Sequence, residues 1–262
     1  MTKIAWLTDQ HGIFIDRDAW ELALLLTQRF QPDVVPVGSD DIDFYRLSKF
    51  DKNPDRRETV QDELDFQWER YEELVSAVPE ACFYPTVLGN HNERFFKRLW
   101  DDPKFFGLNA LEYRSLMGYD HFGFSWAGNA WDANANREYS PAPGLAFTHG
   151  VKVSQFPGYS VKSEMASRFY DASLVMGHCH RGAITWVTKP SGEQLVGIEG
   201  FCLCGLQPEY ANHTNWTQGV VFATVHDDLP TQFELIPFDR AGGRLCAHWR
   251  DEAYSVPLTS AF

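Results

Sequence analysis

The stretch VMGHCHRG, residues 175–182, holds two histidines one residue apart, between two glycines. In an extended segment alternate side chains point to the same side, so His178 and His180 are expected to present two imidazoles to one spot past a strand end. Imidazole is a common metal ligand, although an isolated H-x-H is equally typical of a surface loop. A metal site therefore requires further ligands from elsewhere in the chain.

Further ligand-type side chains follow other apolar runs. Open α/β sheets place their sites at the carboxyl ends of strands, so these side chains are expected to meet. The residues at predicted strand ends are Asp9 and His11, Asp40 and Asp43, Asn90 and His91, His149, and His178 and His180. This set of oxygens and imidazoles is large enough for two ions and suits Mn, Fe or Zn better than Ca or Mg. The sequence therefore predicts a two-metal site.

Alternating strands and helices must position these ligands. Apolar runs predict strands at 4–9, 33–41, 81–89, 145–150 and 173–178. Helical spacing predicts helices at 18–30, 56–78, 92–100 and 160–172, the first capped by Asp16 or Asp18. Pro36 weakens the second strand prediction.

The second half of the chain is expected to be rich in β-structure. Alternating apolar residues predict strands at 183–189, 194–204, 218–226 and 231–238. Before them, aromatics and glycines at about 103–143 indicate hairpins and a long irregular loop. The prediction is a single α/β domain over residues 1–262, with a helical insertion at about 44–80.

Composition limits the functions that need to be considered. The 262 residues include enough apolar side chains for a sizeable core, and the net charge of −13 disfavours non-specific binding of long duplex DNA. No apolar run is long enough to span a bilayer, and the N-terminus does not resemble a signal peptide. Five cysteines without a disulfide-framework spacing favour a reducing environment, so we expect a cytoplasmic protein.

The ordered motifs resemble the calcineurin-like metallophosphoesterase superfamily. They read TDQHG, GSDDIDF, GNHNER, THG and GHCHRG, and they span residues 9–180. The part of the sequence that contains the last three motifs is also similar to uncharacterised phosphoesterases encoded by phages and bacteria. The resemblance implies a four-layer αββα sandwich, with two mixed β-sheets and a dinuclear metal site at the strand ends.

The resemblance also implies a role for each matching residue. The implied ligands are Asp9, His11 and His180 for one metal, and Asn90, His149 and His178 for the other. Asp40 would bridge the two ions, and His91 would stand over the substrate phosphate as a cation and proton donor. Two dications roughly 3.5–4 Å apart make a bridging hydroxide available near neutral pH, and this hydroxide attacks phosphorus in line. The expected ions are Mn, with Fe, Zn, Co or Ni as alternatives.

The second motif departs from the family pattern. The family usually has G-D-x-x-D, and here Ser39 intervenes, so either Asp40 or Asp41 could be the bridge. Asp40 is favoured because Asp43 then falls at the second acidic position. Asp43 is expected to steady a metal-bound histidine by accepting its other N–H. Gly38, Gly89 and Gly177 are expected to let the backbone turn sharply before the ligands.

The third motif also departs from the pattern. The residue after His91 is usually an acid that orients the imidazole, and here it is Asn92, followed by Glu93. Either Glu93 or Asp43 could replace the missing acid. Arg94 and Arg181 flank the motifs and could bind phosphate, although exposed or paired arginines are more common at such places. The segment 208–219, with Tyr210, His213 and Trp216, could line the pocket or form a solvent-facing loop.

The expected function is hydrolysis of a phosphate ester, with a small or nucleotide-type phosphodiester as the first choice of substrate. The alternatives are a DNA exonuclease or endonuclease of the repair type, a phosphomonoesterase, and a non-catalytic metal-dependent binding module. The serine/threonine protein phosphatases are disfavoured, because DDIDFYRL lacks the arginine-glycine pair of their second motif. The expected partner is a phosphate-ester substrate, with a nucleotide or a single-stranded nucleic acid as candidates. No interaction with a membrane is expected. The oligomeric state is left open.

Overall fold

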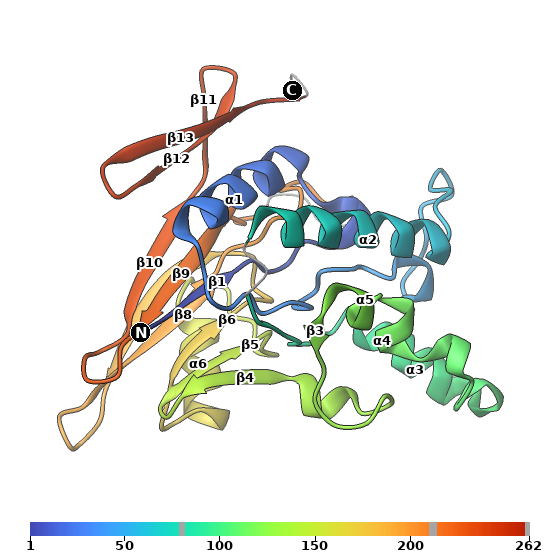
Figure 1. The fold of residues 1–262 in the computed structure, drawn as a ribbon, viewed down its shortest axis with the longest axis horizontal. Helices are drawn as coiled ribbons and strands as arrows, with labels where there is room; N and C mark the ends of the chain where they lie inside the picture. Colours follow the sequence, from blue (N-terminus) through green and yellow to red (C-terminus); the bar gives the residue numbers. More distant parts are fainter. Residues whose placement is uncertain (79–81, 210–213, 260–262) are drawn as a thin grey trace.

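The computed structural model describes residues 1–78, 82–209 and 214–259, and it is a mixed α/β fold (Figure 1). The first sheet has the antiparallel order β1-β9-β10, with β1 at Thr2–Trp6, β9 at Gly219–Val225 and β10 at Gln232–Pro237. Its neighbour on the β1 side is the segment 33–37, which makes isolated bridges instead of the predicted strand. Pro36 has no N–H to donate, which explains the interrupted pairing. The predicted strand at 81–89 is reduced to β2, Tyr84–Pro85, which pairs with β3, Phe124–Ser125.

The second sheet has five strands in the order β4-β5-β6-β8-β7. The strands are β4 at Glu138–Ala142, β5 at Leu145–Thr148, β6 at Ser173–Met176, β7 at Gly182–Thr188 and β8 at Gln194–Gly200. The central strands β5, β6 and β8 run parallel, and both edge strands are antiparallel to their neighbours. The carboxyl ends of β5 and β6 therefore open on the same edge, just before His149 and His178.

Six α-helices surround the sheets within the described residues. They are α1 at Arg17–Phe30, α2 at Val60–Ala77, α3 at Glu93–Asp101, α4 at Tyr113–Leu116, α5 at Tyr119–Phe122 and α6 at Tyr159–Arg168. The side chain of Asp16 caps α1 by accepting from the Ala19 amide, and Thr59 with Asp62 forms a capping box at α2. These caps place the starts of both helices close to where the sequence pattern predicted them.

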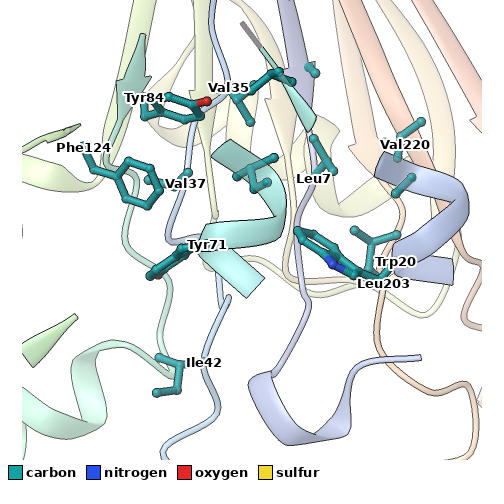
Figure 2. Close-up of a cluster of buried hydrophobic side chains, with 14 of the residues drawn as sticks. Leu7, Trp20, Val35, Val37, Ile42, Tyr71, Tyr84, Phe124, Leu203 and Val220 are labelled. Carbon is teal, nitrogen blue, oxygen red and sulfur yellow. The ribbon is translucent and has the colours of Figure 1, made fainter. Parts of the chain in front are cut away.

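Alternation along the strands divides the core between the two faces of each sheet. In β1, Ile4 and Trp6 join a buried cluster that includes side chains of β5, β6 and β8. Ala5, with Leu7 just after the strand, joins a separate cluster with α1 and α2. Figure 2 shows part of this second cluster, with Trp20 of α1 beside Leu7 and Val220. Side chains of α6 cover the other face of the five-stranded sheet.

Two regions differ from the sequence prediction. The stretch predicted as hairpins and a loop contains short helical turns at Pro103–Phe105, Asn109–Leu111 and Ala133–Asn136, together with α4 and α5. A third sheet, which the sequence pattern did not predict, is formed by β11 at Asp239–Ala241, β12 at Arg244–Trp249 and β13 at Glu252–Pro257. Among the described helices, none is both long and apolar enough to cross a membrane.

Candidate metal centre

The loops after the strands adopt an unusual backbone at the residues with ligand-type side chains. The positive-φ residues at these loops are Asp9, His11, Asp40, His178 and His180, with φ values of 54°, 57°, 50°, 70° and 56°. Left-handed conformations are costly for residues other than glycine, and they cluster where the surrounding structure holds functional side chains. The expectation of an extended H-x-H is therefore wrong. The two side chains do not share one spot, since His180 groups with His11 and Cys204 whereas His178 groups with Asp40 and His149.

The three glycines of the motifs serve different purposes. Gly38 has φ +103°, the left-handed turn that was expected. The other two have no positive φ, and at these positions the limit is space. A Cβ at Gly89 would lie 2.1 Å from Asp40 Oδ1, and a Cβ at Gly177 would lie 2.6 Å from Asp9 Oδ2. These two glycines therefore allow loops to approach the carboxylates closely.

One set of ligand-type side chains gathers around His11 and His180. His11 Nε2 lies 3.0 Å from His180 Nε2. Asp9 Oδ1 lies 3.2 Å from His180 Nε2 and 3.9 Å from His11 Nε2. We call Asp9, His11 and His180 the His11 half of the site, and all of them are at least nine-tenths buried.

A second set gathers around His149. His149 Nε2 lies 3.0 Å from Asn90 Oδ1, 3.1 Å from His178 Nδ1 and 3.1 Å from Asp40 Oδ2. We call Asn90, His149 and His178 the His149 half. His149 is buried, whereas Asn90 and His178 are partly open to solvent. A single proton on His149 Nε2 cannot satisfy three acceptors at once, but a cation between them can.

Asp40 lies between the two halves. Its carboxylate forms one potential metal-binding group with His11 and His91, and another with His149 and His178. Asp41 faces away, because its carboxylate contacts Tyr71 and accepts from Asn92 Nδ2 at 2.7 Å. The structure therefore brings Asp40, and not Asp41, into the cluster.

These buried groups could hold a metal ion. Nitrogen ligands about 2.1 Å from an ion lie about 3.0–3.4 Å apart in octahedral or tetrahedral geometry, close to the separations found here. Burial alone would raise the pKa of Asp9, but His180 and His149 outweigh it and lower the pKa to about 2. Burial, assisted by His149, lowers the pKa of His178 to about 4. Asp9 and His178 are therefore in the deprotonated form that metals require at neutral pH. In His11, His149 and His180 the nearby anionic groups outweigh burial and raise the pKa, so a bound cation would displace protons from these rings.

His91 stands beside the cluster and is oriented by Asp43. His91 Nδ1 lies 2.9 Å from Asp43 Oδ2, and the same oxygen lies 3.1 Å from His11 Nδ1. The guanidinium of Arg94 donates to Asp43 Oδ1 at 2.6 Å and lies 3.1 Å from His91 Nε2. Burial lowers the pKa of His91, and the nearby Asp40 and Asp43 carboxylates only partly oppose this. One carboxylate thus fixes the rings of both His11 and His91.

Asn92 and Glu93 do not orient His91. The Asn92 side chain accepts from the backbone amides of Gly89 and Asp40 at 2.9 and 3.2 Å, so it ties the second and third motifs together. Glu93 instead contacts Arg137 and Lys97. Of the two candidate acids, Glu93 and Asp43, it is Asp43 that contacts the His91 ring.

The remaining sequence candidates have separate outcomes. Arg181 is buried and donates to Ser154 O at 2.9 Å and Ser160 Oγ at 3.1 Å, so its guanidinium braces a loop. The ring of Trp216 packs edge-on against His180 with a centroid separation of 4.1 Å. Tyr210 and His213 lie outside the described residues.

Two contacts with candidate metal-binding histidines were not predicted from the sequence. Ser39 Oγ lies 2.9 Å from His149 Nδ1, although this serine was interpreted only as an interruption of the motif. Cys204 was interpreted as a strand residue, yet its buried Sγ lies 3.8 Å from His180 Nδ1 and forms a potential metal-binding group with His11 and His180. The extra residue in GSDD was the signal for Ser39. Cys204 carried no local signal, because its contact is made across 24 residues.

No protein-family model matches this chain, and the curated proteins include no match to its sequence. The superfamily resemblance therefore stays a prediction, and function must be argued from the geometry of the site.

Proposed function

We propose that this chain is a metal-dependent phosphodiesterase that holds two ions, one in each half of the site, with Asp40 as their shared ligand. The observation that carries this proposal is the meeting of two sets of imidazole and oxygen donors at one buried carboxylate. His91 lies beside them, where a substrate on the ions would reach it. The order of the motifs, which resembles calcineurin-like metallophosphoesterases, supports the same function.

Divalent ions in this site would supply Lewis acidity toward phosphate oxygens and would make water acidic enough to ionise near neutral pH. Asp9, His11 and His180 would hold one ion, and Asn90, His149 and His178 the other. The mixture of imidazole and oxygen ligands favours Mn, Fe, Zn, Co or Ni over Ca. The neutral amide of Asn90 adds a ligand without cancelling positive charge.

His91 is the proposed proton donor to the leaving oxygen. Its Nδ1 side is fixed by Asp43, so Nε2 is the atom directed at the reacting group. Without substrate, burial and the nearby His11 ring lower the pKa of His91 and so favour its neutral form, and the Arg94 guanidinium lies 3.1 Å from Nε2. A phosphate placed against His91 and Arg94 would bring negative charge to Nε2, which stabilises the protonated ring and allows it to donate.

We also propose that the fold is a four-layer αββα sandwich formed by one chain. Alternate residues of β1 and β9 contribute to the cluster shared with the five-stranded sheet and to the cluster shared with α1 and α2. The cluster under α6 lies on the outer face of the five-stranded sheet. This distribution supports two sheets packed face to face with helices outside.

The test is hydrolysis of an aryl phosphodiester by protein that has been stripped of metal and reloaded. We expect the stripped protein to be inactive and activity to return with Mn, Fe, Co or Zn, at about two ions per chain by elemental analysis. Activity that survives complete removal of metal would overturn the proposal. Metal binding without hydrolysis of any diester would instead indicate a binding module, and preference for an aryl phosphomonoester would assign the site to that substrate class.

A further inference from the structure

Four cationic side chains lie together beside the candidate site in a chain whose net charge is −13. They are Arg46, Lys52, Arg94 and Arg98, which we call the basic row. Arg94 and Arg98 are four residues apart on α3 and so lie on the same helix face, one turn apart. The backbone carbonyls of Leu47 and Ser48 accept from Arg98, which joins this helix to the loop that carries Lys52.

The positive charge of the basic row is only partly neutralised. Lys52 Nζ donates to Ser48 O at 2.7 Å and contacts the Phe50 carbonyl, and both acceptors are neutral. Within the described residues, no carboxylate lies at ion-pair distance from Lys52 or Arg46. Arg98 has one carboxylate partner, Asp101 at 3.4 Å, whose side chain is 71% exposed. Burial, together with the nearby Arg94 and Arg98, lowers the pKa of Lys52, and the neighbouring Asp51 carboxylate opposes this only in part.

The basic row begins at the candidate site and leads away from it. Arg94 touches His91 at one end. Lys52 lies over the Tyr45 ring at 5.5 Å, and Tyr45 packs against Phe14 at 5.6 Å, just after His11 in sequence. Phe50, next to Lys52 in the same loop, is 66% exposed and has no role in the core. A cationic track with an exposed aromatic ring is the combination that binds single-stranded nucleic acid.

We propose that Lys52 and Arg98 form a second phosphate site, which makes single-stranded oligonucleotides the substrate class. This inference rests on the proposed phosphodiesterase function. One phosphate of the strand occupies the metal centre, a neighbouring phosphate lies between Lys52 and Arg98, and a base stacks on Phe50. Because the net charge of the chain is −13, the basic row selects short or locally single-stranded segments over long duplexes.

The test compares substrates that differ by one phosphate. An aryl phosphodiester and an unphosphorylated dinucleotide offer only the reacting phosphate, whereas dinucleotides with a 5′- or 3′-terminal phosphate also offer a second. We expect one terminally phosphorylated dinucleotide to have a kcat/KM about tenfold or more above that of the unphosphorylated one, the effect of a charged contact. The double variant Lys52→Gln, Arg98→Gln should lose this advantage and leave the rate on the aryl diester unchanged.

Matched variants separate charge from loop structure. Lys52→Arg with Arg98→Lys keeps both charges and should restore the advantage, whereas Lys104→Gln removes an exposed cation just after α3 and should change nothing. The log–log slope of oligonucleotide affinity against salt concentration should become shallower by about 0.7 for each phosphate-binding cation that is removed. Phe50→Ala should weaken binding of the dinucleotide and spare that of an abasic analogue.

The possible failures are distinguishable. An equal loss on all substrates in the double variant would show that Lys52 and Arg98 only brace the loop, and would overturn the second phosphate site while the phosphodiesterase function stands. A wild-type protein without preference for the second phosphate would overturn it as well. A protein that hydrolyses none of these substrates with any metal would overturn the proposed function. Oligonucleotide binding to chelated protein, measured by fluorescence anisotropy, still tests the basic row in that case.

Discussion

The two halves of the candidate metal centre use similar ligands but differ in the groups that contact the outer ring nitrogens of their histidines. These are the Nδ1 atoms of His11, His180 and His149, whose Nε2 atoms face the other ligands. In the His11 half, the outer nitrogens of the rings contact groups that can be anionic. His11 Nδ1 lies 3.1 Å from the Asp43 carboxylate, and His180 Nδ1 lies 3.8 Å from the Cys204 thiol. In the His149 half, the outer nitrogen of His149 contacts the neutral hydroxyl of Ser39. The first half is also more deeply buried than the second.

This difference predicts that the two halves bind metal with unequal strength. An anionic partner on the outer nitrogen of a histidine makes the ring a stronger ligand, and such partners typically change metal affinity by 10–100-fold. The His11 half also contains the carboxylate of Asp9, whereas the His149 half contains the neutral amide of Asn90. We therefore expect a tightly held ion in the His11 half and a more exchangeable ion in the His149 half, where His178 and Asn90 meet solvent.

The largest expected effect follows from removing the carboxylate that the halves share. Asp40→Ala should lower the metal content from about two ions per chain to less than about one and abolish hydrolysis, because both halves lose their common ligand. Elemental analysis and the aryl diester assay measure this result.

Asp41→Ala is the matched control, since Asp41 contacts Tyr71 and Asn92 in the core. This variant should lose stability and keep its metal. If Asp41→Ala emptied the site and Asp40→Ala did not, Asp41 would be the bridging residue.

The next effect concerns His91, which shares Asp43 with the His11 half. His91→Ala should keep both ions and slow alkyl diesters by about 10²–10⁴-fold, while aryl diesters change little because a phenolate leaves without needing a proton. A similar loss on both substrates would assign His91 to stabilisation of phosphate charge. An unchanged rate on both would remove it from the mechanism.

The parts of the site that could be predicted from sequence are those with local signals. Strand ends followed by His149 or His178 can be recognised because the apolar run and the polar residue lie close together in the chain. Conformation within the loops could not be inferred in this way, since the left-handed backbone of His178 and His180 depends on packing around them. Contacts between distant segments, such as that of Cys204 with His180, leave no local pattern at all.

The fold shows the same division between local and distant determinants. The helical spacing of α1 and α2 was recognisable because capping and amphipathic periodicity act within one segment. The strand expected at 33–41 was mostly wrong, because pairing there depends on a neighbouring chain segment and Pro36 removes a donor. The short helical turns between residues 103 and 136 bury aromatic residues such as Tyr113 and Tyr119 in a shared cluster, and composition alone did not indicate helix there.

A smaller effect is expected from replacing the residues that contact the Nδ1 atoms of His180 and His149. It tests directly whether the two halves bind metal with unequal affinity. Cys204→Ser should weaken the tighter ion by about tenfold, and Ser39→Ala should weaken the more exchangeable ion by less than that. Competitive titration of stripped protein with a metal chelator gives both affinities. Equal losses in the two variants, or a larger loss at Ser39, would contradict the ranking of the halves.

The smallest expected effect is on stability, and it concerns two buried carboxylates, Glu63 and Glu164, that accept hydrogen bonds from backbone amides near the site. Glu63 accepts from the Tyr45 amide at 3.0 Å, after the motif that contains Asp43. Glu164 accepts from the Val151 and Lys152 amides, just after His149, and also pairs with Arg168 at 2.9 Å. Within the described residues, Glu63 has no cationic partner, and burial raises its pKa from 4.5 to about 7.

A raised pKa means that the folded protein binds this proton more tightly than the unfolded chain does. The stabilisation from Glu63 is therefore complete below about pH 4.5 and is lost as the pH rises through about 7. Glu63→Gln mimics the protonated form, so variant and parent should have equal free energies of unfolding near pH 4.5. At pH 8 the variant should be more stable by about 1–3 kcal/mol, since each pKa unit corresponds to about 1.4 kcal/mol. Urea denaturation at the two pH values measures the difference, and Glu164→Gln, which breaks an ion pair, should give no gain at pH 8. A Glu63→Gln variant that is less stable than the parent at pH 8 would show that the amide bonds outweigh the cost of the buried charge.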